Sequence, residues 1–280
     1  MKFHDFITGI LCLLVALTLS CSKPLSKRTA NQLHTMQKET LHKSLIRDFY
    51  RRAVAQGDTA FAEQLISDTY IQHSSALKPG KAGVLEALNL MKQMPKPTAT
   101  ATPFMRLIAE DDYVVTNLRF DWGGRQKVVV DLFRFENNQV AEHWDAVQEQ
   151  PETTANGNAM MDGDLPSEDT ALTATNKKIA VEFYQRIFID RQVQDLPEFV
   201  ADDLIQHNPE IANGLEGLHA YLRQPSDTKS TLTIHRTISE GNFVVIQAEG
   251  KRAANPIMVY EIFRLDQRKV VEQWTVESRL

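Results

Sequence analysis

The feature that most constrains the fold is a long internal repeat, in which the same short motifs occur twice in the same order. The offset between copies is 134 residues early in the repeat and 130 residues late in it, so four residues are lost between the anchor points. A period of this length indicates tandem domains rather than a solenoid of short units. The matching pairs are Phe49-Tyr50 with Phe183-Tyr184, Tyr70-Ile71-Gln72-His73 with Leu204-Ile205-Gln206-His207, Phe133-Arg134 with Phe263-Arg264, and Trp144 with Trp274.

Each copy begins with helical periodicity and continues with strands. In the first copy helices are expected from Glu39, after Asp58 and over Lys81–Met94. β-branched and aromatic runs separated by turn residues then predict strands. The strands of the first copy are expected at 102–109, 113–122, 126–135 and 140–148. In the second copy we expect helices at 176–190, 196–199 and 215–222, and strands at 230–238, 243–250, 256–265 and 270–277. Helices followed by a run of antiparallel strands give an α+β fold in both copies.

Composition divides the chain into five parts. Residues 1–21 read as a lipoprotein signal peptide, 22–38 as a polar tether and 39–151 as the first domain. Residues 152–173 are small, polar and acidic, which is typical of a flexible linker. Residues 174–280 form the second domain.

The N-terminus predicts export. Phe6–Leu19 is an apolar run of signal-peptide length, too short for a comfortable membrane span of about 20 residues. The Ser20-Cys21 step that follows resembles a bacterial lipobox, which makes Cys21 the expected lipidated residue, with an uncleaved N-terminal anchor as the alternative. The expected location is the cell envelope, facing the periplasm, and Ser22 after the cysteine slightly favours the outer membrane. The other cysteine, Cys12, lies inside the signal, so no disulfide is expected in the domains.

The hairpin over 128–151 is the strongest candidate for a site. Asp131 interrupts an otherwise apolar strand, where a carboxylate is costly unless it is paired or functional. In the return strand His143 and Asp145 share one face, because side chains alternate along a strand. These three residues therefore predict a polar floor for a pocket.

The order of an F-Y pair, I-Q-H, a Gly-led helix, V-V-D-x-F-R and E-H-W-D-x-x-Q resembles the SnoaL-like polyketide cyclase family, in particular its aldol-condensation branch. The resemblance covers both copies. It implies two tandem cone-shaped domains of the nuclear transport factor 2-like type, a cystatin-like roll in which three helices pack on a curved antiparallel sheet around an apolar cavity. It implies no cofactor.

The same resemblance implies proton abstraction next to a carbonyl, an aldol or cyclase step that needs a base and donors for the enolate oxygen. Asp131 would act as base or acid, His143 and His73 would donate to the oxyanion or carry the proton, and Asp145 would orient a histidine. In the second copy Glu261, Gln273 and Thr275 replace the Asp, His and Asp, so that copy is expected to be depleted. The expected substrate-contacting residues are Asn117, Arg119, Trp122, Phe133, His207 and Glu261.

Other functions remain open or are disfavoured. The net charge of −5 gives no basic surface for nucleic acid. Asp131, Asp145, His73 and His143 are plausible metal ligands, but no tight ligand motif is present, so no metal is predicted. No G-x-S-x-G elbow supports a serine nucleophile. Asp131 and His143 could also simply satisfy each other in the core. The alternative function is then a lipoprotein that binds a small apolar ligand without turnover, or a scaffold in which the two domains pack as an internal pseudo-dimer.

Overall fold

The computed structural model describes residues 27–74, 76–93, 105–122, 124–166, 170–224, 231–252 and 255–280. The signal peptide with Cys21 lies outside these residues, as does the side chain of Trp122. No described helix is both long and apolar enough to cross a bilayer.

The two domains repeat one order of elements, and the α+β fold class is confirmed. The first domain contains α1 (Lys27–Asp48), the π-helix η1 (Phe49–Ala55), α2 (Thr59–Leu65), β1 (Ile66–Gln72), α3 (Gly80–Gln93), β2 (Met105–Glu110), β3 (Tyr113–Trp122), β4 (Arg125–Glu136) and β5 (Gln139–Glu149). The second contains α4 (Thr173–Phe183), the π-helix η2 (Tyr184–Ile189), the short η3 (Val193–Asp195), α5 (Leu196–Phe199), β6 (Val200–Gln206), α6 (Gly214–Leu222), β7 (Thr233–Glu240), β8 (Phe243–Arg252), β9 (Asn255–Asp266) and β10 (Lys269–Arg279).

Each domain has a five-stranded sheet with the same topology. The strand orders are β1-β5-β4-β3-β2 and β6-β10-β9-β8-β7. Strands β1 and β6 pair in parallel with β5 and β10, and every other pairing is antiparallel. The sequence did not mark β1 or β6 as strands, because each is a short polar segment at a sheet edge that follows a helix directly.

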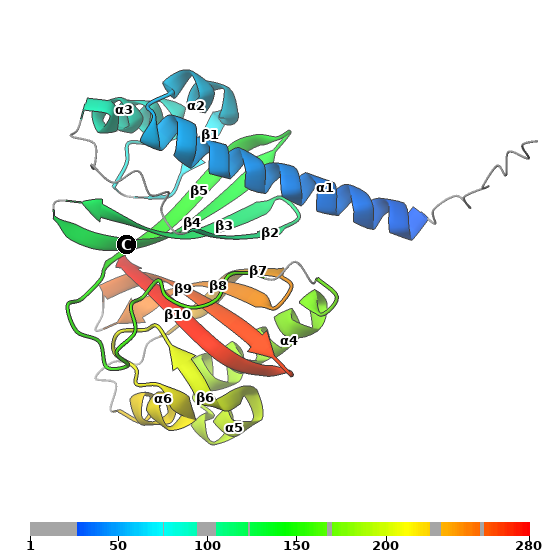
Figure 1. Ribbon diagram of the computed structural model, residues 1–280, viewed down its shortest axis with the longest axis vertical. Coiled ribbons are helices and arrows are strands. Elements are labelled where there is room, and N and C mark those ends of the chain that lie inside the picture. The colour runs from blue at the N-terminus through cyan, green and yellow to red at the C-terminus, as the bar shows by residue number, and fades with distance from the viewer. Residues whose placement is uncertain are drawn as a thin grey trace, which may run out of the picture.

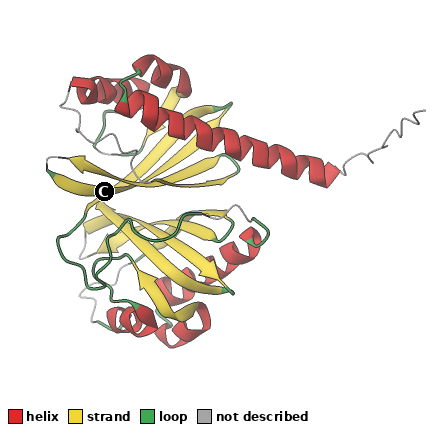
Figure 2. Ribbon diagram, in the orientation of Figure 1, coloured by secondary structure: helices red, strands yellow, loops and turns green. Residues whose placement is uncertain are grey.

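The sheets face each other, and the helices cover their far sides (Figures 1 and 2). We call the side of each sheet that packs on its own helices the helical face, and the other side the interdomain face. Strand alternation divides the strand residues between the two faces. One apolar cluster therefore draws from both domains, including Val130 and Trp144 of the first and Tyr260 and Trp274 of the second. Two further clusters lie beneath the helices, one in each domain.

Polar contacts cross the interdomain face in pairs related by the repeat. The guanidinium of Arg106 lies 4.3 Å from the ring centroid of Trp274, and that of Arg236 lies 4.0 Å from Trp144. At the other end, Glu240 accepts a hydrogen bond from the Ala109 amide at 2.8 Å. Its counterpart Glu110 accepts one from the Ser239 amide at 2.9 Å. The repetition of each contact gives the pair of domains an approximate twofold symmetry.

The linker is an ordered part of this interface. Met160 and Met161 are buried in the interdomain cluster. The Asn156 amide donates to the Asn208 and Ile211 carbonyls at 2.6 and 2.9 Å. At Gly163, which has φ +96°, a Cβ would lie 1.9 Å from a carboxylate oxygen of Glu272. The expectation of a flexible linker is therefore wrong for this stretch, because its apolar and backbone groups find partners on both domains.

The expected tether is also wrong from Lys27 onward. Helix α1 begins there, twelve residues before the expected start at Glu39, and its N-terminal part extends past the sheet (Figure 1). The N-terminal part of α1 is mostly exposed and therefore rich in polar residues such as Lys38. These residues gave the sequence the composition of a tether. By contrast, Asp58 caps α2 as expected, since its side chain accepts from the Phe61 amide at 3.1 Å.

Candidate functional site

Three adjacent strands bring polar side chains together on the helical face of the first domain. The register pairs Thr116 of β3 with Asp131 of β4, and Asp131 with Asp145 of β5. The next pair on the same face is Phe133 with His143. The sheet thus places a carboxylate pair and an imidazole side by side, as the sequence predicts for Asp131, His143 and Asp145.

Asp131 is almost completely buried and is surrounded by donors. Its Oδ1 lies 2.9 Å from Nε2 of His143. Its Oδ2 accepts from the Tyr50 hydroxyl and from Thr116 Oγ1, the latter at 3.2 Å. Three partners from η1, β3 and β5 therefore fix this carboxylate. Sequence reasoning missed Tyr50 and Thr116, although the repeated Phe49-Tyr50 pair was visible as a signal.

The far side of the His143 ring is bound by Gln72 at the end of β1. His143 Nδ1 lies 3.0 Å from Gln72 Oε1, and the same oxygen accepts from the Ser74 amide at 3.2 Å. A backbone N–H can only donate, so it fixes the orientation of the Gln72 amide with its oxygen toward the ring. His143 Nδ1 then donates to Gln72, and Nε2 makes the hydrogen bond to Asp131. The imidazole is therefore held in one orientation from both sides.

Asp145 is the less constrained acid of the cluster. Burial is the largest influence on it and raises the pKa of its carboxyl above the ordinary value; nearby His143 opposes this shift and nearby Asp131 adds to it. Burial likewise raises the pKa of the Tyr50 hydroxyl, and the carboxylate of Asp131 beside it acts in the same direction. The expected role of Asp145 in orienting a histidine is wrong, because Asp131 and Gln72 hold His143.

His73 does not join this cluster. Its ring stacks on Trp144 with centroids 4.4 Å apart, and its Nε2 lies 2.9 Å from Glu142, on the interdomain face. Arg134 donates to the same Glu142 at 2.6 Å. The placement of His73 contradicts its expected catalytic role, since it belongs to a network that supports Trp144.

The second domain repeats that network. His207 stacks on Trp274 with centroids 4.9 Å apart and lies 2.9 Å from Glu272, which also accepts from Arg264 at 2.7 Å. The expected substrate contact by His207 is therefore wrong as well. The motifs that revealed the duplication, I-Q-H, F-R and E-x-W, mainly build the interdomain face.

Of the other expected substrate contacts of the first domain, Asn117 and Arg119 lie away from the cluster and Phe133 lies beside it. Asn117 lies on the interdomain face, where its Oδ1 accepts from Arg106 at 2.9 Å. Arg119 alternates with Thr116 and is exposed. Phe133 is buried and stacks on the His143 ring at 4.7 Å, so it supports the imidazole from the core. In the register of β3 with β4, Asn117 and Arg119 lie opposite Val130 and Val128, whose side chains point to the other face from Asp131. Side-chain alternation could therefore have excluded both residues as substrate contacts.

In the second domain Gln273 and Thr275 stand where the first has His143 and Asp145, and Gln206 matches Gln72. Gln206 donates to Gln273 at 2.8 Å, and Gln273 donates to Glu261 at 3.0 Å. Thr275 also donates to Glu261, at 2.8 Å. Glu261 thus occupies the floor position of Asp131, but no imidazole accompanies it. Burial raises the pKa of Glu261 to about 7, and the two donors only partly offset this.

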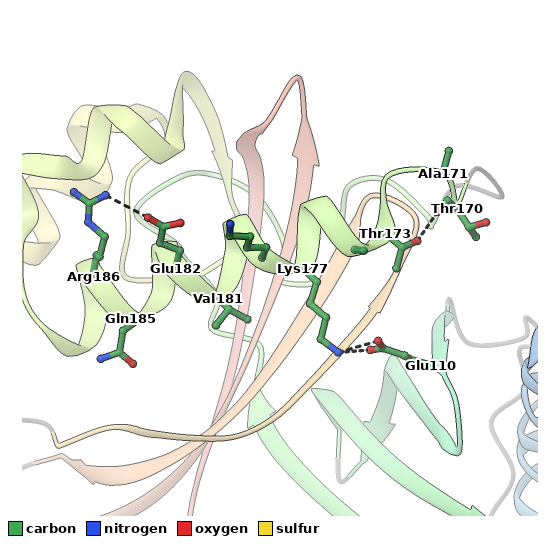
Figure 3. A pocket seen from close by; sticks show the side chains of 11 residues that line it. Glu110, Thr170, Ala171, Thr173, Lys177, Val181, Glu182, Gln185 and Arg186 are labelled. Carbon is green, nitrogen blue, oxygen red and sulfur yellow. Dashed lines mark hydrogen bonds and ion pairs between the residues drawn. The ribbon is translucent and has the colours of Figure 1, made fainter. Parts of the chain in front are cut away.

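Two surface hollows lie away from the Asp131 cluster. The larger, with a volume of about 770 Å³, is an open groove along α4 that reaches Glu110 of the first domain (Figure 3). Lys177 crosses one end of it and pairs with Glu110 at 2.7 Å. The smaller, of about 230 Å³, opens on the helical face of the second sheet beside Thr275 and Glu277. Among the described residues, no three His, Cys, Asp or Glu side chains are grouped to hold a metal ion.

Comparison with known proteins finds a family similarity in the second domain. Residues 180–273, most of that domain, match the family model of the SnoaL-like domain. This match falls on the copy that was expected to be depleted. No curated protein matches the chain.

Solved structures with similarity to this chain each span about one domain. An NTF-2 like protein of unknown function from Burkholderia xenovorans is 17% identical over 42% of this chain and 90% of its own, with a TM-score of 0.35. A SnoaL-like polyketide cyclase from Agrobacterium tumefaciens is 13% identical over 37% and 91%, with a TM-score of 0.33. An LEH-like epoxide hydrolase from M. tuberculosis is 16% identical over 38% and 81%, with a TM-score of 0.32.

The raised pKa of Glu261 predicts a pH-dependent stability. An acid with a folded-state pKa of about 7 and an ordinary value of 4.5 favours the fold only while it is protonated, so stability falls as pH rises from 4.5 to 7. Glu261→Gln removes this loss and keeps an acceptor for Gln273 and Thr275. We expect the variant to gain about 2–3 kcal/mol of unfolding free energy relative to wild type between pH 5 and pH 8.

Urea denaturation at both pH values measures this difference. Glu216→Gln, at an exposed carboxylate on α6, is the control and should follow wild type at both pH values. A difference between Glu261→Gln and wild type that stays constant with pH would contradict the protonated state of Glu261.

Proposed function

We propose that the first domain binds a small carbonyl compound against its helical face and catalyses proton transfer at the carbon next to the carbonyl, without a cofactor. The observation that carries the proposal is the meeting of Asp131, His143 and Tyr50, from three separate elements, at one buried point. Such a cluster offers imidazole and phenol donors to the negative charge that develops on an enolate oxygen. A lyase or isomerase of the cyclase or aldol-condensation type fits this chemistry.

In this proposal Asp145 takes the substrate proton. Asp145 makes a hydrogen bond with Ser74, but it lacks the three side-chain partners that engage Asp131, and burial raises the pKa of its carboxyl, which favours proton uptake. Asp131 acts as a positioning residue that holds the His143 ring through Nε2. Gln72 supports the same ring from the other side.

A second candidate is ligand binding without turnover, in a scaffold of two domains. The observation that favours it is that protein groups already engage both oxygens of Asp131, as in a structural carboxylate. The extensive interdomain face supports the accompanying proposal that the two domains serve each other as an internal pseudo-dimer.

Exchange of α-protons for deuterium, followed by NMR over a panel of small ketones and β-keto esters, tests the catalytic proposal. We expect wild type to accelerate exchange for at least one compound and Asp145→Asn to lower that rate by a factor of 10² or more, since general-base catalysis contributes about 10²–10⁴. Asp121→Asn, at an exposed carboxylate on β3, should exchange like wild type. Equal rates in Asp145→Asn and wild type would contradict the base, and binding without exchange in wild type would favour the second candidate.

We also propose that the chain is exported and anchored through a lipid on Cys21, facing the periplasm, with the outer membrane slightly favoured. The support is the apolar run of Phe6–Leu19 followed by Ser20-Cys21. Metabolic labelling with an alkynyl fatty acid should mark wild type in the membrane fraction. Cys21→Ser should abolish the label and leave the signal uncleaved, and a labelled Cys21→Ser variant would exclude this residue as the anchor.

A further inference from the structure

The second domain carries a small pocket with a charged lining, to which Gln148 of the first domain also contributes. The 230 Å³ hollow is formed on the helical face by alternate residues of β10, Thr275 and Glu277, and by Arg252 at the end of β8. Asn208 and Glu210, in the loop after β6, close one side of it. At its inner end the Thr275 hydroxyl donates to Glu261, so the pocket reaches the floor position that Asp131 has in the first domain.

The charges of this pocket are absent from the matched positions of the first copy. At the repeat offsets of 130 and 134 residues, Glu277 corresponds to Val147, Glu210 to Ala76 and Arg252 to Trp122. At the floor the change is reversed, since Thr275 corresponds to Asp145. At these matched positions the first domain therefore has its charge at the floor, at Asp145. The second domain has its charges at Glu210, Arg252 and Glu277, which we call the mouth of the pocket. A copy kept only as a packing partner has no need of a charged mouth.

The mouth of the pocket carries both positive and negative side chains. Arg252 pairs with Glu277 at 2.7 Å and also shares a hydrogen bond with Tyr221, while its Nη1 lies 3.8 Å from Glu210, beyond hydrogen-bond length. The Arg252 side chain is 47% exposed and lines the pocket. Arg279 adds a second exposed guanidinium to the lining. Two cations and two carboxylates therefore line one small volume.

We propose that this pocket binds a small zwitterion of the α-amino acid type. Its carboxylate would bind the guanidinium of Arg252 beside Glu210, where planar guanidinium and carboxylate groups match. Its ammonium group would lie between Glu210 and Glu277. A simple anion would meet two carboxylates and a simple cation two guanidinium groups, so only a ligand with both charges is matched throughout. The volume equals roughly seven or eight water molecules at about 30 Å³ each, which suits a molecule of that size.

Thermal-shift titration of the purified full chain with the common α-amino acids tests the proposal, because a ligand that binds only the folded state raises the Tm. Propionate and ethylamine serve as probes that carry only one of the two charges. We expect at least one amino acid to give a saturable increase in Tm, and neither single-charge probe to do so at the same concentration. Arg252→Met should weaken the response at least tenfold, and Glu277→Gln should weaken it as well.

The matched control is Arg223→Met, which removes an exposed guanidinium at the end of α6 outside the pocket and should keep the wild-type response. Circular dichroism of each variant checks that it is folded. The proposal is overturned if no amino acid raises the Tm, if propionate acts as strongly as the amino acid, or if folded Arg252→Met responds like wild type.

Discussion

Two arginine–tryptophan contacts join the facing sheets, one from a completely buried arginine and one from a partly buried arginine. Arg106 is completely buried, an unusual position for a guanidinium, and it is tolerated there because every side of it finds a partner. It stacks on Trp274 and donates to Asn117 and to the linker carbonyls of Met161, Asp162 and Asp164. One side chain thus joins the first sheet, the linker and the second sheet. Arg236 repeats the stacking on Trp144 from the opposite domain.

This interface bears on the candidate site through strand alternation. Trp144 lies between His143 and Asp145 on β5, so the strand that carries the site on one face carries an interdomain anchor on the other. His73 packs against the same indole. Each domain consequently packs against the strand that carries its neighbour's polar floor. The second domain can thus support the strand of the first domain's site even if it catalyses no reaction itself.

The sequence predicted the elements and the central cluster but not the partners. The repeat, the polar hairpin and the side-chain alternation were sufficient to bring Asp131, His143 and Asp145 together. They could not show that Tyr50 and Gln72 complete the cluster, because those contacts bridge about 80 and 70 residues of chain and depend on how η1 and β1 dock. His73 and His207 were misassigned because a motif read along the chain does not show which face of the sheet it supplies. The linker was wrongly predicted to be flexible, because its composition does not show that Met160 and Met161 pack between the two sheets.

The most direct test of this account is equilibrium unfolding of Arg106→Met, followed by tryptophan fluorescence and by circular dichroism. Arg119→Met, at an exposed arginine on the neighbouring strand, is the control. The account predicts one shared transition that loses about 2–4 kcal/mol in Arg106→Met, because several buried acceptors are left unsatisfied, and a change within about 0.5 kcal/mol in the control. A loss in Arg106→Met no larger than in the control, or a shift confined to one of two separate transitions, would contradict an interface on which both domains depend.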